Sequence, residues 1–157
     1  MAKSKTDRHE GQSSPARDEA GLRATGPRRH ILELLEATED CLTADEIHAR
    51  LRGSGRRVGL ATVYRTLNVM RDRGAIERID AGDGVARYET AASRAEDHHH
   101  HLICRSCHRV RKYSQFSEEE LALMTRTEQR LQQRFGYQIV GHRIYFEGIC
   151  PECQAAQ

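Results

Sequence analysis

Residues 59–90 read GLATVYRTLNVMRDRGAIERIDAGDGVARYET, and this stretch decides the fold of the N-terminal half. Apolar side chains recur in it at the i, i+4 and i+7 spacing of one helix face, at Val63, Leu67 and Met70. The spacing predicts a helix over residues 60–73, and Gly74 is a typical residue to end it. The same periodicity turns Thr62, Tyr64 and Arg65 away from the core.

A hairpin is expected after this helix and two helices before it. The β-like segments 76–80 and 85–90 flank a turn rich in glycine and aspartate. One earlier helix begins near Pro27, and a second begins at Thr43, which forms a Thr-x-x-Glu capping box with Glu46. Three short helices and a hairpin predict a winged helix-turn-helix whose third helix enters the major groove of DNA.

The charge of this half is strongly uneven. The whole chain has a net charge of only +2, but residues 50–73 contain seven arginines and a single acid, Asp72. Such a stripe is typical of nucleic-acid binding, although a solvated helix face gives the same charge pattern. Tyr64 and Arg65 are candidates for base contacts. For Tyr64, packing against the core is the alternative.

Four of the five cysteines form two Cys-x-x-Cys pairs, Cys104/Cys107 and Cys150/Cys153. Two such turns supply the four ligands of a closed tetrahedral zinc site. Disulfides or a thioredoxin-like redox pair are the alternatives. We favour structural zinc, because both pairs are present and no redox βαβ pattern surrounds either.

Four consecutive histidines, residues 98–101, lead into the first cysteine pair. On a strand, alternate side chains face opposite sides, so His99 and His101 share one face and His98 and His100 share the other. This predicts two half-sites of imidazoles, which suit zinc, iron, cobalt or nickel. A solvated tract or an affinity tag is the alternative, and the neighbouring cysteines favour metal binding.

The remaining pattern divides the chain into a tail, two domains and a hinge. Residues 1–19 are polar and predict a disordered tail, 20–90 the winged-helix domain, 91–97 a hinge, and 98–157 a metal-binding dimerisation domain. The last domain is expected to contain strands at 101–104, 110–113 and 137–146, with a helix over 117–134 that starts at a Ser117–Glu120 capping box. The expected class is α+β: a winged helix followed by a small α/β domain with a four-cysteine zinc site.

Length and composition agree with small domains in the cytoplasm. The chain has 157 residues, 38% of them hydrophobic, with no tryptophan. Small domains with so little hydrophobic core often need a bound metal ion to be stable. No apolar run approaches membrane-spanning length and no signal peptide is recognisable, so we expect no membrane and a cytoplasmic location, where paired cysteines bind metals more often than they form disulfides.

The chain resembles the ferric uptake regulator family of bacterial metal-dependent repressors over residues 21–153. The matching segments are GLRAT-x-PRR-x-IL at 21–32, LTADEIHARL at 42–51, GLATVYRTLN at 59–68, HHHHLICRSC at 98–107 and G-x-C-x-x-C at 148–153. The resemblance implies a homodimer that binds an AT-rich inverted repeat in double-stranded DNA when Fe2+ or Zn2+ is loaded. It also implies that Arg23 enters the minor groove, while Tyr64 and Arg65, with Thr62 beside them, contact the major groove.

The resemblance implies two further metal sites besides the structural zinc. The regulatory ligands would be Cys41, Glu89, His99 and His101. An additional site would combine His98, His100 and His142 with a helix glutamate. We assign Glu119 to it, with Glu120 and Glu128 as alternatives, because the helix is longer here than in the family.

Three positions depart from the family pattern. Cys41 stands where iron-sensing members usually have histidine, and a thiolate there favours zinc; an incidental loop cysteine is the alternative. Lys112 replaces an acidic ligand of many members, which removes that ligand. His108 replaces a glycine, either as a surface residue or as an extra ligand.

The pattern as a whole predicts a metal-responsive repressor of metal-uptake or metal-homeostasis genes, and three other functions are the alternatives. A peroxide-sensing repressor of the same family typically has aspartate at the position of Glu89. A zinc-stabilised DNA-binding module would lack any metal response. A zinc hydrolase is disfavoured because the chain has no His-Glu-x-x-His motif. We therefore expect neither enzymatic activity nor a small-molecule substrate.

Overall fold

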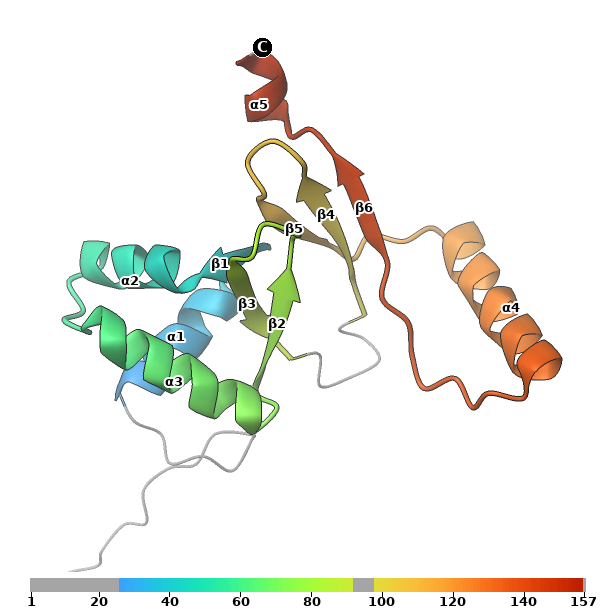
Figure 1. The fold of residues 1–157 in the computed structure, drawn as a ribbon, viewed down its shortest axis with the longest axis horizontal. Helices are drawn as coiled ribbons and strands as arrows, with labels where there is room; N and C mark the ends of the chain where they lie inside the picture. The colour runs from blue at the N-terminus through green and yellow to red at the C-terminus, as the bar shows by residue number, and fades with distance from the viewer. Residues whose placement is uncertain (1–25, 92–97, 157) are drawn as a thin grey trace, which may run out of the picture.

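A computed structural model of the protein describes residues 26–91 and 98–156. The expected tail at 1–19, Arg23 and residues 92–97 of the expected hinge lie outside the described residues. Figure 1 shows the N-terminal helices and a hairpin on one side of the molecule, a second group of strands beside them, and a long helix on the far side. No helix in the described part of the chain is long and apolar enough to cross a membrane.

The N-terminal half has the predicted order of helices. These are α1 (Gly26–Glu36), α2 (Ala44–Gly53) and α3 (Leu60–Asp72). The Thr43 side chain accepts a hydrogen bond from the backbone N–H of Glu46, whose own carboxylate accepts from the Thr43 backbone, so the predicted capping box is confirmed. The core of this half consists of Ile31, Leu35, Leu42, Ala44, Ile47, Leu51, Val63, Leu67, Met70, Ile76 and Tyr88. The predicted inner face of α3 is therefore buried.

The hairpin is formed by β2 (Ile76–Asp80) and β3 (Ala86–Thr90), within one residue of the prediction. Its antiparallel register runs from Ile76 opposite Thr90 to Asp80 opposite Ala86. Gly82 and Gly84 in the turn have φ angles of 82° and 77°, which side chains disfavour. The hairpin beside α3 completes a winged helix.

A short strand that the sequence did not indicate, β1 (Asp40–Thr43), connects the two halves of the protein. Leu42 of β1 pairs with Tyr88 of β3, and Cys41 pairs with Val110 of β5. The six strands consequently form one sheet in the order β2-β3-β1-β5-β4-β6. Cys41 lies at the centre of this sheet, where strands of both halves meet.

The C-terminal half contains β4 (His100–Cys104), β5 (Val110–Tyr113), α4 (Glu118–Phe135), β6 (Tyr145–Gly148) and α5 (Pro151–Ala155). The predicted capping box of Ser117 and Glu120 is present, and Gly136 ends α4 in the left-handed conformation. The prediction of a strand over 137–146 was wrong for most of its length. The strand β6 pairs in parallel with β4, from Tyr145 opposite His101 to Gly148 opposite Cys104. In this register residues 137–143 lie beyond the end of β4, which begins at His100.

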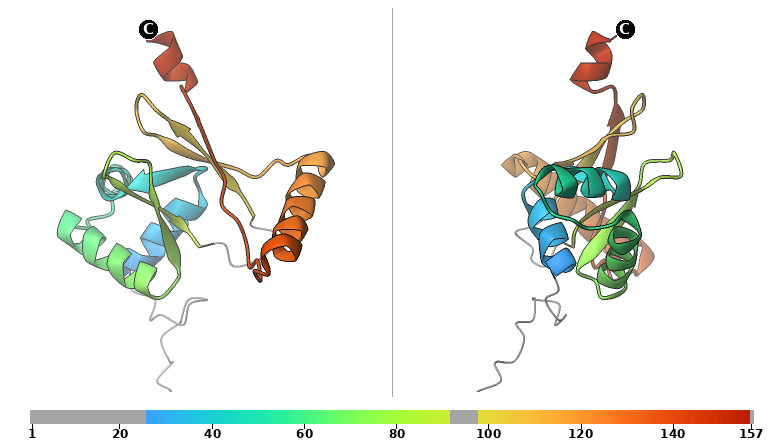
Figure 2. Two further views of the ribbon diagram at one scale, coloured as in Figure 1. Left: turned by 45° about the vertical axis from the view of Figure 1, so that its right-hand side comes forward. Right: turned by 90° about the vertical axis from the view of Figure 1, so that its left-hand side faces the viewer.

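Helix α4 stands apart from the strands in Figure 1 and in the left view of Figure 2. None of its side chains is buried, and β6 is exposed along its whole length. The exposed apolar residues of this region are Leu121, Leu123, Leu131, Phe135, Tyr137, Val140, Tyr145 and Phe146. An apolar surface of this extent is typical of an interface with another chain.

Candidate metal centres and DNA-binding surface

The two cysteine pairs meet at one end of the sheet, because β4 and β6 run in parallel and deliver both turns to the same edge. Their four sulfur atoms lie within 4.8 Å of one another, and the Sγ atoms of Cys107 and Cys150 are 3.8 Å apart. All four are free cysteines. The backbone N–H groups of Cys107 and Cys150 donate to Cys104 and lower the pKa of that thiol to about 6. Four thiols at these separations fit a tetrahedral zinc site.

The second cluster surrounds Glu89, which is buried on β3. Its carboxylate lies 3.0 Å from Nε2 of His99 and 3.1 Å from Nε2 of His101. The Cys41 thiol donates to the same carboxylate at 3.4 Å. The four residues expected from the resemblance are therefore side by side, contributed by β1, β3, β4 and the segment before β4.

The charges in this cluster are strongly perturbed. Burial raises the pKa of Glu89, but hydrogen bonds from His101 and His99 outweigh burial and hold it at about 2. Burial, the charge of Glu89 and the hydrogen bond to Glu89 raise the pKa of Cys41 far above its ordinary value. The carboxylate is thus ionised, whereas the thiol is neutral and must release a proton to bind a metal.

The third cluster consists of histidines from the opposite face of the histidine run. Nε2 of His100 lies 3.1 Å from Nε2 of His98 and 3.1 Å from Nε2 of His142. The predicted alternation is confirmed, since His98 and His100 face His142 while His99 and His101 face Glu89. Nδ1 of His142 contacts the Glu128 carboxylate at 2.7 Å, which orients the ring.

The carboxylate that contacts this cluster through His142 belongs to Glu128, one of the two alternatives, rather than to Glu119. In this cluster, the residues whose ligand atoms lie within 4.8 Å of one another are His98, His100 and His142. The carboxylate of Glu128 contacts the His142 ring at Nδ1. Glu119 lies in the first turn of α4, nine residues before Glu128. At the helical rise of 1.5 Å per residue, the two positions are about 13 Å apart along the axis, so they cannot contact one imidazole together. Glu120, the other alternative, is held in the capping box, and its negative charge acts on His100 of the cluster.

Both histidine clusters open onto one cleft of about 520 Å³. Its lining residues are Glu77, Glu89, His98, His99, His101, Val140, Gly141, His142 and Arg143. The sequence did not single out Glu77, Gly141 or Arg143, because residues on a strand and in a connecting segment carry no local signal of such a cleft. Ions bound in the two clusters would therefore be close neighbours.

The structure shows the contacts or the backbone conformation of the three positions that depart from the family pattern. Cys41 lies on β1 rather than in a loop, and its thiol contacts Glu89. Lys112 is the strand partner of His101, and its backbone N–H donates to the Glu39 carbonyl. His108 has a left-handed φ of 56°, and it does not belong to the cluster of four cysteines.

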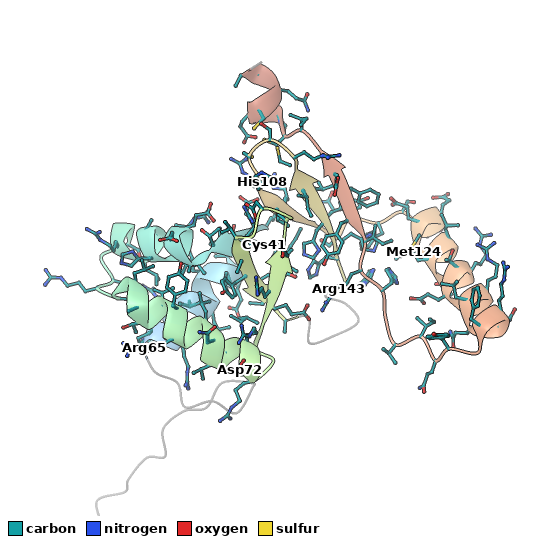
Figure 3. The ribbon with its side chains drawn as sticks, viewed as in Figure 1. Cys41, Arg65, Asp72, His108, Met124 and Arg143 are labelled. Atoms are coloured by element: carbon teal, nitrogen blue, oxygen red, sulfur yellow. The ribbon has the colours of Figure 1, made fainter. Side chains whose placement is uncertain are left out.

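The outer face of α3 presents the expected DNA-contacting residues. Tyr64 is 44% exposed and donates a hydrogen bond to Asp45 at 3.3 Å, so it does not pack into the core. Arg65 is exposed beside it, and Thr62 is half-buried. Figure 3 shows Arg65 on the side of the molecule opposite α4. An exposed arginine and tyrosine on one helix face are side chains that can contact bases and phosphates in the major groove.

The sequence and the fold are similar to those of known proteins. The model of the ferric uptake regulator family matches residues 19–147. A ferric uptake regulation protein of Neisseria meningitidis is 34% identical over 138 residues, covering 87% of this chain and 90% of its own. The ferric uptake regulator of Vibrio cholerae superposes with a TM-score of 0.68 at 30% identity, over 84% of this chain and 95% of its own. A zinc-bound manganese uptake regulator gives a TM-score of 0.62 at 34% identity, over 84% and 93%.

Proposed function

The chain belongs to the ferric uptake regulator family, and from this premise we propose that it is a metal-dependent, DNA-binding repressor of metal-uptake or metal-homeostasis genes. The observation that carries the proposal is the cluster around Glu89. Cys41 and Glu89 belong to strands of the winged-helix half, whereas His99 and His101 belong to the other half. An ion bound by all four residues would fix the orientation of the winged helix.

Two classes of metal are part of the proposal. Zinc at Cys104, Cys107, Cys150 and Cys153 is structural, because the four thiols close the coordination shell and tie α5 to β4. The exchangeable ion at Cys41, Glu89, His99 and His101 is Fe2+ or Zn2+. The thiol favours zinc, while the carboxylate and imidazoles also suit iron.

The three histidines His98, His100 and His142 form an additional exchangeable site. Glu128 keeps the His142 ring in place through Nδ1, which leaves Nε2 directed at the other two imidazoles. Three imidazoles leave further coordination positions to water or to a neighbouring group.

The DNA-binding mode follows from the winged helix. Tyr64, Arg65 and Thr62 of α3 contact bases and phosphates in the major groove, and Arg23 enters the minor groove. Residues 20–90 form the DNA-binding domain and 98–157 the dimerisation domain, joined by a hinge at 91–97. The exposed apolar surface of α4 and β6 supports a homodimer, whose two-fold symmetry matches an AT-rich inverted repeat. As a chromosome-binding regulator, the protein acts in the cytoplasm.

The deciding experiment measures DNA affinity and metal content together. A duplex selected by the protein from a random pool is titrated by fluorescence anisotropy at buffered Zn2+ or Fe2+, under anaerobic conditions. We expect metal to tighten binding, Glu89→Ala to abolish that effect, and the exposed control Glu36→Ala to retain it. Elemental analysis should find one chelator-resistant zinc per chain in all three proteins.

Two results would refute this function. If added metal does not change the DNA affinity of the wild type, the protein is a zinc-stabilised DNA-binding module without a metal response. A metal response that survives in Glu89→Ala would show that the Glu89 cluster is not the sensor.

A further inference from the structure

An ion pair between Arg143 and Glu77 joins the two edges of the sheet. Glu77 lies on β2, at one edge, and Arg143 lies two residues before β6, at the other. The guanidinium Nη2 donates to Oε2 of Glu77. The two residues therefore connect the winged-helix half to the C-terminal half at a point separate from β1. Figure 3 labels Arg143.

Glu77 is also the strand partner of Glu89. The two residues are directly opposite in the β2–β3 register, so their side chains share the face that lines the cleft. Carboxylates in this arrangement repel each other. Nε2 of His99 and of His101 lies within hydrogen-bond distance of Glu89, and the Arg143 guanidinium pairs with Glu77.

Arg143 directly follows His142 in the chain. The His142 ring belongs to the three-histidine cluster, while the next side chain contacts β2. Their Cα atoms are only 3.8 Å apart across one peptide bond. Any ligand that fixes the His142 ring therefore restricts the backbone from which Arg143 reaches the winged helix.

We propose that Arg143 is a positioning residue that connects the three-histidine cluster to the winged helix through Glu77. Occupation of the cluster by a divalent cation holds Arg143 in place, and Arg143 holds β2 and with it α3. The proposal rests on the function proposed above. It gives the additional site a second connection to the winged helix, which adjusts the size of a metal response that still requires the Glu89 cluster.

The test compares matched variants of the full-length protein with its structural zinc. Arg143→Gln and Glu77→Gln each remove one partner, and the swap Arg143→Glu/Glu77→Arg rebuilds the pair in reverse. The control is Arg105→Gln, which breaks a more exposed arginine–glutamate pair, with Glu147, that stays within the C-terminal half. The readouts are the Zn2+-dependent gain in DNA affinity and, in metal-free protein, hydrogen exchange of the β2 amides.

We expect each single substitution to reduce the Zn2+-dependent gain about two- to fivefold, as expected for one partly exposed ion pair. The swap should restore most of the gain, and β2 should exchange faster only in the single variants at 77 and 143. In a double-mutant cycle, His142→Ala should cost less in the Arg143→Gln background than in the wild type.

The inference is overturned if Arg143→Gln behaves like Arg105→Gln, if the swap gives no recovery, or if His142→Ala and Arg143→Gln have additive effects. Each of these results leaves the metal response of the wild type intact, so the proposed function stands. Loss of the metal response in the wild type itself would instead overturn the proposed function.

Discussion

Replacement of Glu89 by glutamine should destabilise the metal-free protein, although it removes a buried charge. The two hydrogen-bonded histidines lower the pKa of this carboxyl from 4.5 to about 2, despite its burial. A lowered folded-state pKa stabilises the protein at every pH above the unfolded value, and the contribution is lost as the pH falls through the folded value. At pH 7 the full contribution is present.

The size of this effect follows from the shift. The difference between 4.5 and about 2, at 1.36 kcal/mol per unit, corresponds to about 3 kcal/mol of unfolding free energy. The glutamine amide keeps the volume of the side chain but cannot carry the negative charge. The Cys41 thiol would keep an acceptor in the amide oxygen, so the loss is chiefly that of the two histidine contacts.

The assay is urea unfolding at pH 7 with the structural zinc retained and exchangeable metal removed. Wild type, Glu89→Gln and the exposed control Glu36→Gln are compared at equal protein concentration, because dimerisation makes stability concentration-dependent. We expect a loss of about 3 kcal/mol in Glu89→Gln only. Adding Zn2+ at a hundred times its dissociation constant should stabilise the wild type by about 2.7 kcal/mol and the variant far less.

A metal-free Glu89→Gln protein that is as stable as the wild type, or more stable, would refute this prediction. That result would mean that desolvation of the carboxylate outweighs its histidine contacts, so the free site stores strain that metal relieves. The structure argues for the opposite balance.

Three further predictions concern the other parts of the protein. Cys104→Ser should lose the resistant zinc and the folded C-terminal half, because structural zinc contributes about 10–16 kcal/mol in small zinc domains; elemental analysis and circular dichroism at a range of temperatures measure both. Arg65→Gln should weaken binding to the selected duplex by about 1–3 kcal/mol while affinity for unrelated DNA falls less, as anisotropy titrations with both duplexes would show. Leu123→Glu should shift the protein from dimer to monomer, whereas Glu119→Gln on the same helix should not, and sedimentation equilibrium distinguishes the two.

The winged helix was predictable because its signals are local. A capping box fixes the start of α2, and the spacing of Val63, Leu67 and Met70 fixes the buried face of α3. Each signal depends on residues within two helical turns of one another. The short strand β1 has no such signal, since its four residues acquire strand geometry only by pairing with β3 and β5.

The metal-binding clusters were likewise predictable only where their signal is local in the sequence. Alternation along a strand was enough to separate His99 and His101 from His98 and His100, because it depends only on the period of two. The choice of Glu128 over Glu119 depends on where α4 sits relative to His142, which no local pattern encodes. Arg143 and Glu77 are 66 residues apart and meet only because the sheet brings its two edges together.

The position of β1 also limits what metal can do to DNA affinity. Backbone pairing of Cys41 with Val110 already holds the two halves together, so the ligands of the Glu89 cluster are adjacent before any ion binds. Metal can therefore only shift the equilibrium between the arrangement of the protein that binds DNA and its other arrangements. The size of the shift cannot exceed the difference in metal affinity between these arrangements. We expect a coupling of about 1–3 kcal/mol, a 5- to 150-fold gain in DNA affinity. Linkage requires the selected duplex to tighten Zn2+ binding by the same factor, and a competition titration with a chelator in its presence and absence measures it. Unequal factors would mean that metal also changes the dimer, through the three-histidine cluster and α4.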